Sequence, residues 1–394
     1  MQNCSPQISE CIEKIGDYII EKMPKGVLES IVLIGSFSKD EGSVYLNKEN
    51  KLIALSDIEF IIILKNNADY RRLKNKAVQL SMDISQAMRE KGIDIEIDLG
   101  FSLNGFLKRM EPCAFTYELK NYGKVIWGNQ GILEIIPDYQ KEKVKKEESI
   151  KVIFNRGIEQ LKEVFGDRKD DMKTQTYQIC KGYSNLASTL LMASGKYEPQ
   201  YRKMAAGLEQ IDINRFNGLK EKINKWLDFK LNPKEDLLFK NREEVLDEWE
   251  RLRRYYKEIW LDISVSKYQS VKVPEIEKLA KIYFKKEELK GKIKGWGKLL
   301  LCQNGYGNVA LLRALRLILN GSPKLLTWLC GMIVYLNYVS TEDKVHKTDS
   351  RKQNTEDFIK KCVPIIPGEY RNKELNWKDL RKIVIYNWEK FAKK

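Results

Sequence analysis

The spacing of apolar residues changes from one segment of this chain to the next, and each spacing predicts a type of secondary structure. Between residues 7 and 24 the apolar positions recur three or four apart, which predicts an amphipathic helix ended by Pro24 and Gly26. Continuous β-branched runs at 30–34 and 58–64 are typical of buried strands. The other elements expected in this part are a helix at 70–91, a strictly alternating strand at 93–99 and a closing strand at 124–127.

From about residue 146 onward the pattern is almost entirely helical. Helices are expected at 146–165, 172–194, 199–210, 235–262, 275–290, 308–338 and 376–393. Residues 291–307 are rich in Gly and Lys and predict an interruption, and residues 339–354 predict a polar loop. The sequence therefore predicts an α+β protein: a small mixed sheet with helices in residues 1–140, a helical domain in 141–270 and a basic helical region in 271–394.

Charge is distributed unevenly along the chain, whose formal net charge is +15. Residues 1–150 carry 21 basic and 23 acidic side chains, and the remainder carries 49 and 32, so the first part is near −2 and the rest near +17. This division indicates an acidic centre that needs cations, next to a body that attracts phosphates, nucleic acid or an acidic partner. A Lys-rich solvated surface is the alternative explanation.

Cysteine usage and the apolar segments indicate a protein of the cytoplasm with no membrane partner. The seven cysteines are scattered without a CxxC pair, and the single histidine, His346, lies in a polar segment where a surface position is expected. The N-terminus lacks the features of a signal peptide, and no apolar run reaches the roughly 20 residues that span a bilayer. The most apolar segment, Leu325 to Val339, predicts a buried helix.

Acidic residues gather at two of the predicted strands. Asp57 and Glu59 are two positions apart, so their side chains point to the same face, and Asp94, Glu96 and Asp98 do the same on the alternating strand. Neighbouring carboxylates repel each other unless cations neutralise them, and Mg²⁺ prefers carboxylate ligands. An edge strand whose acidic face meets water is the alternative.

A Gly-Ser pair precedes these acids and changes their interpretation. Gly35 and Ser36 follow an apolar strand, so they predict a tight turn whose backbone N–H groups and hydroxyl hold a triphosphate. The order from Leu33-Ile34-Gly35-Ser36-Phe37 through Glu41-Gly42 to Ser56-Asp57-Ile58-Glu59-Phe60 resembles the signature of the DNA polymerase β-like nucleotidyltransferase superfamily, over roughly residues 28–130. Two departures are the long insertion at 45–55, expected to be a loop beside the pocket, and Glu59 where Asp is commonest.

The resemblance implies an enzyme that uses two Mg²⁺ ions and a nucleoside triphosphate, expected to be ATP. It implies that Asp57 and Glu59 bind metal, together with a third carboxylate for which Glu96 matches best and Asp98 and Asp94 are rivals. Gly35, Ser36 and Ser56 would bind the nucleotide. Glu96 or Asp98 would activate the acceptor hydroxyl.

A weaker resemblance extends into the helical part. Residues 181–187 and 195–201 are similar to the helix and Tyr-containing turn that follow the catalytic domain in antibiotic nucleotidyltransferases, which implies that Lys181 contacts nucleotide phosphates. It also suggests a small-molecule hydroxyl as acceptor.

Two alternatives stay open: transfer to an RNA end or a protein hydroxyl, and a non-catalytic module that binds RNA or a partner. Either would use the basic half of the chain. Lys292, Lys294 and Lys298, with Trp296 available for stacking, are the expected RNA contacts.

Overall fold

The computed structural model describes residues 5–268, 283, 287–302, 316–318, 320–338, 350–371 and 373–392. The chain forms two compact units: unit 1 comprises residues 1–149 and 172–241, and unit 2 comprises residues 150–171 and 242–394. His346, most of the helix expected at 275–290 and the first part of the helix expected at 308–338 lie outside the described residues. The three functional domains expected from the sequence stay a prediction.

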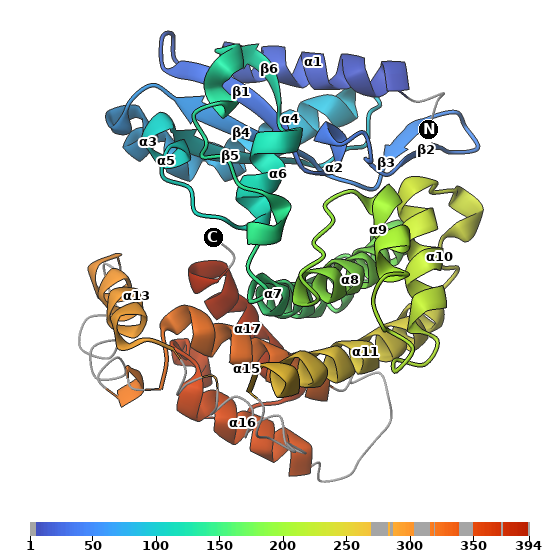
Figure 1. Cartoon of the computed structure of the whole chain (residues 1–394), viewed down its shortest axis with the longest axis vertical. Coiled ribbons are helices and arrows are strands. Elements are labelled where there is room, and N and C mark those ends of the chain that lie inside the picture. The colour runs from blue at the N-terminus through green and yellow to red at the C-terminus, as the bar shows by residue number, and fades with distance from the viewer. Residues whose placement is uncertain are drawn as a thin grey trace. The chain divides into compact units, whose positions relative to one another are not determined.

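Unit 1 is built around a four-stranded mixed sheet in the order β5-β4-β1-β6 (Figure 1). Its strands are β1 (Leu28–Ile34), β4 (Ile58–Leu64), β5 (Ile97–Leu103) and β6 (Lys124–Gly128). β1 pairs antiparallel with β4 and β6, whereas β4 and β5 run parallel. The prediction of an α+β protein with a small mixed sheet is confirmed.

The two faces of the sheet pack against different helices. Even-numbered residues of β4 join Ile19 of α1 (Ser5–Lys22) and Ile84 of α4 (Ala77–Glu90) in one apolar cluster. Odd-numbered Ile61 and Ile63 join Leu119 of α6 (Ala114–Tyr122) in a second cluster. Side chains at odd positions of β4 therefore lie on the face that α6 covers.

The prediction of a strand at 93–99 is wrong at its start. β5 begins at Ile97 because its partner begins at Ile58, and a strand needs a neighbour to pair with. The preceding residues turn to another partner: the Asp94 carbonyl accepts a hydrogen bond from the Ala54 N–H at 3.3 Å.

The insertion expected to be a long loop contains a short hairpin, made of β2 (Val44–Leu46) and β3 (Leu52–Ala54). Its turn is closed by Asn47, whose side-chain oxygen accepts from the N–H groups of Glu49 at 3.0 Å and Lys51 at 2.8 Å. Such an Asn turn lets a chain reverse direction between two strands.

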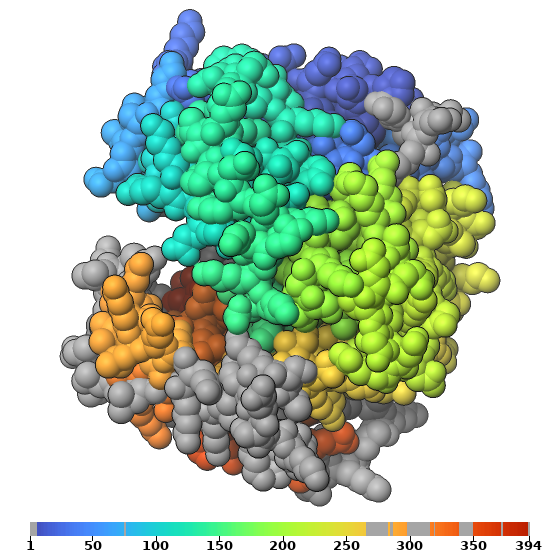
Figure 2. Space-filling model, in the orientation of Figure 1, coloured from blue at the N-terminus to red at the C-terminus, as the bar shows by residue number. Residues whose placement is uncertain are grey.

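The remaining helices of unit 1 are α2 (Gly35–Ser38), α3 (Asn67–Leu73), α5 (Asn104–Leu107), α8 (Met172–Ala193), α9 (Tyr201–Leu208) and α10 (Leu219–Leu231). α3 and α4 divide the expected helix at 70–91, and α10 was not expected. Short 3₁₀ turns occur at Lys74–Lys76, Gln130–Leu133, Lys141–Lys143 and Glu235–Leu237. In the space-filling view, the yellow-green surface of α9 and α10 lies directly against the blue N-terminal part (Figure 2).

Unit 2 is helical throughout its described residues. It contains most of α7 (Glu148–Val164), and α11 (Arg242–Tyr268), α13 (Leu289–Cys302), α15 (Pro323–Asn337), α16 (Ser350–Cys362), α17 (Trp377–Phe391) and a 3₁₀ turn at Gly368–Tyr370. α15 is largely buried, which confirms the prediction for the most apolar segment. No helix in the described ranges is both long enough and apolar enough to span a membrane.

Two predictions in this unit are wrong. The Gly-rich interruption at 291–307 is helical up to Cys302, because at least one of its glycines serves helix packing. A Cβ on Gly295 would lie 3.0 Å from Cδ of Pro323 at the start of α15. Of the loop expected at 339–354, residues 350–354 are helical and belong to α16, whereas residues 339–349 lie outside the described residues.

Candidate active site

The acid pair lies where β4 begins, at the centre of the sheet. Asp57 directly precedes the strand, and Glu59 is its second residue. Glu59 pairs with Ile34 of β1 on one side and with Asp98 of β5 on the other. Because residues paired in register point to the same side of a sheet, Glu59 and Asp98 share the face that α6 covers.

Gly35 follows β1 and lies against the Glu59 carboxylate. Its φ is +71°, a left-handed conformation that favours glycine, and a Cβ there would lie 1.8 Å from Oε2 of Glu59. Gly35 therefore provides the space that the Glu59 side chain occupies. Ser36 continues into α2, where its carbonyl accepts from the N–H groups of Lys39 at 3.2 Å and Glu41 at 2.9 Å.

The two carboxylates of the pair have opposite electrostatic environments. Burial raises the pKa of Glu59 to about 7, and the adjacent charges of Asp57 and Asp98 act in the same direction. Burial also opposes ionisation of Asp57. The positive charges of Lys181 and Lys230 and a backbone hydrogen bond outweigh it, so the pKa of Asp57 is lowered.

Lys181 projects from α8 onto the acid pair. Its Nζ lies 3.3 Å from Oδ1 of Asp57 and 5.0 Å from the centroid of the Tyr177 ring. The Lys181 side chain is 22% exposed and the Asp57 side chain is 33% exposed, so both can be reached from solvent.

The candidates for the third carboxylate separate in the structure. Asp98 faces Glu59, whereas Asp94 forms an ion pair with Lys173 of α8. Glu96 is exposed and lies before β5, where its carbonyl accepts the Ile58 N–H at 2.9 Å. Asp98 is therefore the candidate that pairs directly with Glu59, whereas Asp94 is paired with a lysine.

Within the described ranges, no three Asp, Glu, His or Cys side chains are close enough together to coordinate one ion. The donor chemistry of Asp57, Glu59 and Asp98 nevertheless suits a divalent cation. Burial and the neighbouring charges of Asp57 and Asp98 raise the pKa of Glu59, and a bound cation would relieve this cost of ionising Glu59.

Ser56 is buried behind the acid pair, in a cluster that the sequence did not predict. Its Oγ accepts the Ser43 N–H at 2.9 Å and the Lys230 ammonium at 3.1 Å, and it lies 2.6 Å from the Tyr177 hydroxyl. Ser56 is only 2% exposed. Its hydroxyl is thus committed to contacts inside the protein, away from the partly exposed Asp57 side chain.

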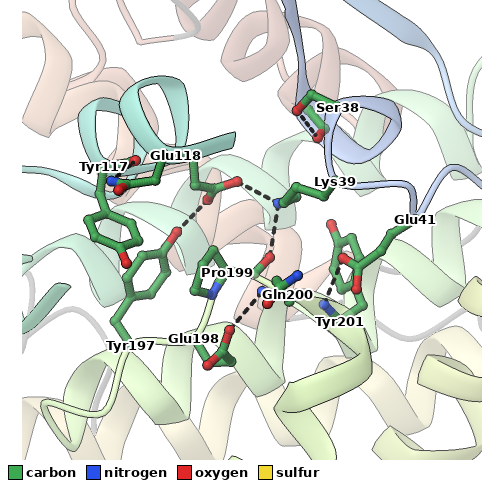
Figure 3. A network of polar contacts seen from close by, with 12 residues as sticks. Ser38, Lys39, Glu41, Tyr117, Glu118, Tyr197, Glu198, Pro199, Gln200 and Tyr201 are labelled. Atoms are coloured by element: carbon green, nitrogen blue, oxygen red, sulfur yellow. Dashed lines mark hydrogen bonds and ion pairs between the residues drawn. The ribbon is translucent and has the colours of Figure 1, made fainter. Parts of the chain in front are cut away.

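Two residues that follow the Gly-Ser turn reach the segment before α9, as Figure 3 shows. Lys39 donates to Oε2 of Glu118 at 2.5 Å and to the Pro199 carbonyl at 2.9 Å. Oε1 of Glu118 accepts a hydrogen bond from the Tyr197 hydroxyl. The Tyr-containing turn is thereby fixed against the Gly-Ser turn.

Glu41 makes the second connection to this segment. Its side chain is fully buried, and its two oxygens accept from the N–H groups of Tyr201 at 2.9 Å and Arg202 at 3.1 Å. Nε of Arg202 adds a third hydrogen bond at 3.0 Å. Buried carboxylates need such partners, which the sequence alone could not identify.

The expected RNA contacts in unit 2 have a different environment from the one predicted. Trp296 is 1% exposed and its indole N–H donates to the Gly321 carbonyl at 2.8 Å, so it is a core residue and cannot stack on a base. Lys292 is also buried, whereas Lys294 is exposed. The side chain of Lys298 lies outside the described residues.

No family model matches the chain, and no curated protein is significantly similar to it.

Proposed function

We propose that the protein is a Mg²⁺-dependent nucleotidyltransferase with a catalytic domain of the polymerase β-like type. The observation that carries the proposal is the position of Glu59: Gly35 lies on one side of it, Asp98 on the other and Asp57 two residues before it. The Gly-Ser turn, which we assign to phosphate binding, thus lies next to carboxylates of β4 and β5 at one end of the sheet. Nucleotidyl transfer requires these two features to be adjacent.

In this proposal each group has a separate task. Asp57, Glu59 and Asp98 would hold Mg²⁺, which when bound neutralises charge on the phosphate oxygens. Gly35 and Ser36 would contact the triphosphate through backbone N–H groups. Lys181, already 3.3 Å from Asp57, is close enough to contact the same phosphates.

The reaction is a displacement at the α-phosphorus of the nucleoside triphosphate. The acceptor hydroxyl oxygen forms a bond to that phosphorus, the bond to the bridging oxygen breaks, and pyrophosphate leaves. The hydroxyl proton would pass to a carboxylate, for which Asp98 is well placed because it lies on the exposed edge strand β5.

A small-molecule acceptor is the version we favour. The RNA contacts expected around Trp296 lose their stacking residue, because that side chain is in the core. Transfer to an RNA end or to a protein hydroxyl remains the alternative within the same chemistry.

The test uses ATP labelled with ³²P at the α-position or at the γ-position, incubated with Mg²⁺ and with small-molecule, RNA and protein pools. Nucleotidyl transfer predicts that only the α-label enters product and that Asp57→Asn abolishes it. Incorporation of the γ-label would indicate phosphoryl transfer instead. A protein whose melting temperature does not respond to ATP with Mg²⁺ would contradict nucleotide binding itself.

A further inference from the structure

Lys230 is a buried lysine in the last turn of α10. It is 3% exposed, and burying an ammonium is unfavourable unless its charge and its N–H groups are satisfied. Its Nζ donates to Oγ of Ser56 at 3.1 Å and to the hydroxyl of Tyr177. It also lies 4.7 Å and 5.0 Å from the ring centroids of Tyr177 and Tyr201, where cation–π attraction contributes.

The contacts of Lys230 form a closed network with the base of the β2–β3 hairpin. Oγ of Ser43 donates to the Lys230 carbonyl at 2.6 Å, and the Ser43 N–H donates to Oγ of Ser56 at 2.9 Å. The ammonium of Lys230 thus holds one end of the hairpin and its carbonyl holds the other. All four residues of the network, including Tyr177, are buried.

A count of lone pairs fixes the direction of the remaining hydrogen bond. Oγ of Ser56 already accepts from Ser43 and Lys230, which uses both of its lone pairs. Its own hydrogen is then directed to the Tyr177 hydroxyl at 2.6 Å. Ser56 is therefore held from three sides, and the next residue in the chain is Asp57.

Lys230 and Lys181 act on Asp57 in different ways. Lys181 is partly exposed and contacts the Asp57 carboxylate directly. Lys230 is buried and contacts the residue before it. A nucleotide could reach Lys181, whereas the network encloses Lys230.

We infer that Lys230 is a positioning residue for the acid pair: it fixes Ser56, and with it the backbone that presents Asp57, without contacting the nucleotide. This inference rests on the proposed function. Groups that orient metal ligands through hydrogen bonds typically affect metal affinity although they do not touch the ion.

The test measures Mn²⁺ affinity by electron paramagnetic resonance, in the absence of nucleotide. Removing a positive charge near a cation site strengthens cation binding by Coulomb's law alone. Positioning predicts the opposite for Lys230→Met: Mn²⁺ affinity should fall by about 10-fold. Lys181→Met is the matched comparison, because it frees the Asp57 carboxylate and should leave Mn²⁺ affinity equal or higher.

Two further variants distinguish a loss of positioning from a loss of folding. Lys225→Met removes an exposed lysine of the same helix and should leave Mn²⁺ affinity unchanged. Tyr177→Phe keeps the ring and removes only the hydroxyl that contacts Lys230 and Ser56, so it should weaken Mn²⁺ binding in the same direction even if Lys230→Met does not fold.

The outcomes distinguish the positioning role of Lys230 from the proposed function. Unchanged or tighter Mn²⁺ binding by a folded Lys230→Met, or unchanged binding by Tyr177→Phe, would overturn the positioning role while leaving the proposed function intact. If the wild-type protein binds no Mn²⁺, with or without ATP, the proposed function fails and the inference fails with it. Weaker binding by both variants, with Asp57→Asn abolishing it, supports both.

Discussion

Gly35, which directly follows β1, lies next to Glu59 of β4. A side chain at Gly35 would collide with the Glu59 carboxylate, and Glu59 in turn faces Asp98. The chemistry proposed for the site thus depends on a residue that has no side chain. The steric effect of a side chain at Gly35 can be separated from the effect of its left-handed backbone, because Gly26 has a similar φ without a close neighbour.

Gly35→Ala should displace the Glu59 carboxylate and weaken binding of ATP with Mg²⁺ by more than about 10-fold, since the ligand would be misplaced. Its left-handed φ should also lower the free energy of unfolding by about 1–2 kcal/mol. Gly26→Ala is the control: its φ is +79°, but nothing lies within 4 Å of a Cβ there. Titration calorimetry should show normal ATP affinity for Gly26→Ala. Equal loss in both variants would contradict the steric explanation.

Glu59 should make the protein less stable as the pH rises. Burial raises its pKa to about 7 in the folded state from the ordinary value of 4.5, so the folded protein holds a proton that the unfolded chain releases. Stability contributed by the protonated group is complete below pH 4.5 and is lost as the pH rises through 7. In metal-free buffer, Glu59→Gln should therefore match wild type near pH 4.5 and exceed it by roughly 1–3 kcal/mol at pH 8. Urea unfolding at both pH values measures this, and a constant difference would refute it.

At the scale of elements, the segment after the Gly-Ser turn connects the sheet to α9. Gln200, the N-cap residue that precedes α9, makes no side-chain capping hydrogen bond. Glu41 supplies the cap from a distant part of the chain, and Lys39 holds the Pro199 carbonyl. The same short segment thus follows the Gly-Ser turn and anchors the helical part of unit 1.

Glu41→Gln should lower the free energy of unfolding by about 1.5–3 kcal/mol, because an amide cannot accept all the hydrogen bonds that Tyr201 and Arg202 donate to the carboxylate. Urea unfolding measures the loss. Glu49→Gln, at an exposed position in the hairpin turn, should change stability by less than about 0.5 kcal/mol. Equal stability of the two variants would show that the buried contacts of Glu41 contribute little.

At the scale of the whole molecule, the excess positive charge after residue 150 predicts general attraction to polyanions. Attraction of this kind releases counterions and is lost as salt increases, whereas a shaped RNA site retains affinity. Trp296 lies in the core of unit 2, where it stabilises the fold and cannot stack on bases.

Binding of a single-stranded RNA oligomer, followed by fluorescence anisotropy, should weaken by at least about 10-fold between 50 and 200 mM salt. Trp296→Ala should lower stability by about 3–5 kcal/mol through the cavity it leaves, without changing RNA affinity at temperatures where it is folded. Tight RNA binding at 200 mM salt that Trp296→Ala abolishes would favour the RNA-end alternative.

The sequence alone determined the elements that local pattern controls. The β-branched run at 58–64 is β4 to the residue, because a short apolar run of this composition favours a buried strand. The prediction at 172–194 matches α8 within one residue, because helical spacing is sustained over several turns. The sequence prediction was wrong where tertiary contacts outweigh local preference. Gly295 predicted a break in the helix, but its close packing against Pro323 makes glycine suitable there.

Tertiary structure decided which of the candidate residues come together. Asp94, Glu96 and Asp98 are equivalent in an alternating pattern. Only the register of β4 against β5 places Asp98 opposite Glu59, and only the packing of α8 pairs Asp94 with Lys173. Lys230 could not be distinguished from other lysines in the sequence, because its burial depends on Ser56, Tyr177 and Tyr201 in distant segments. Sequence period specifies which face a residue occupies, whereas strand register and helix docking specify what that face meets.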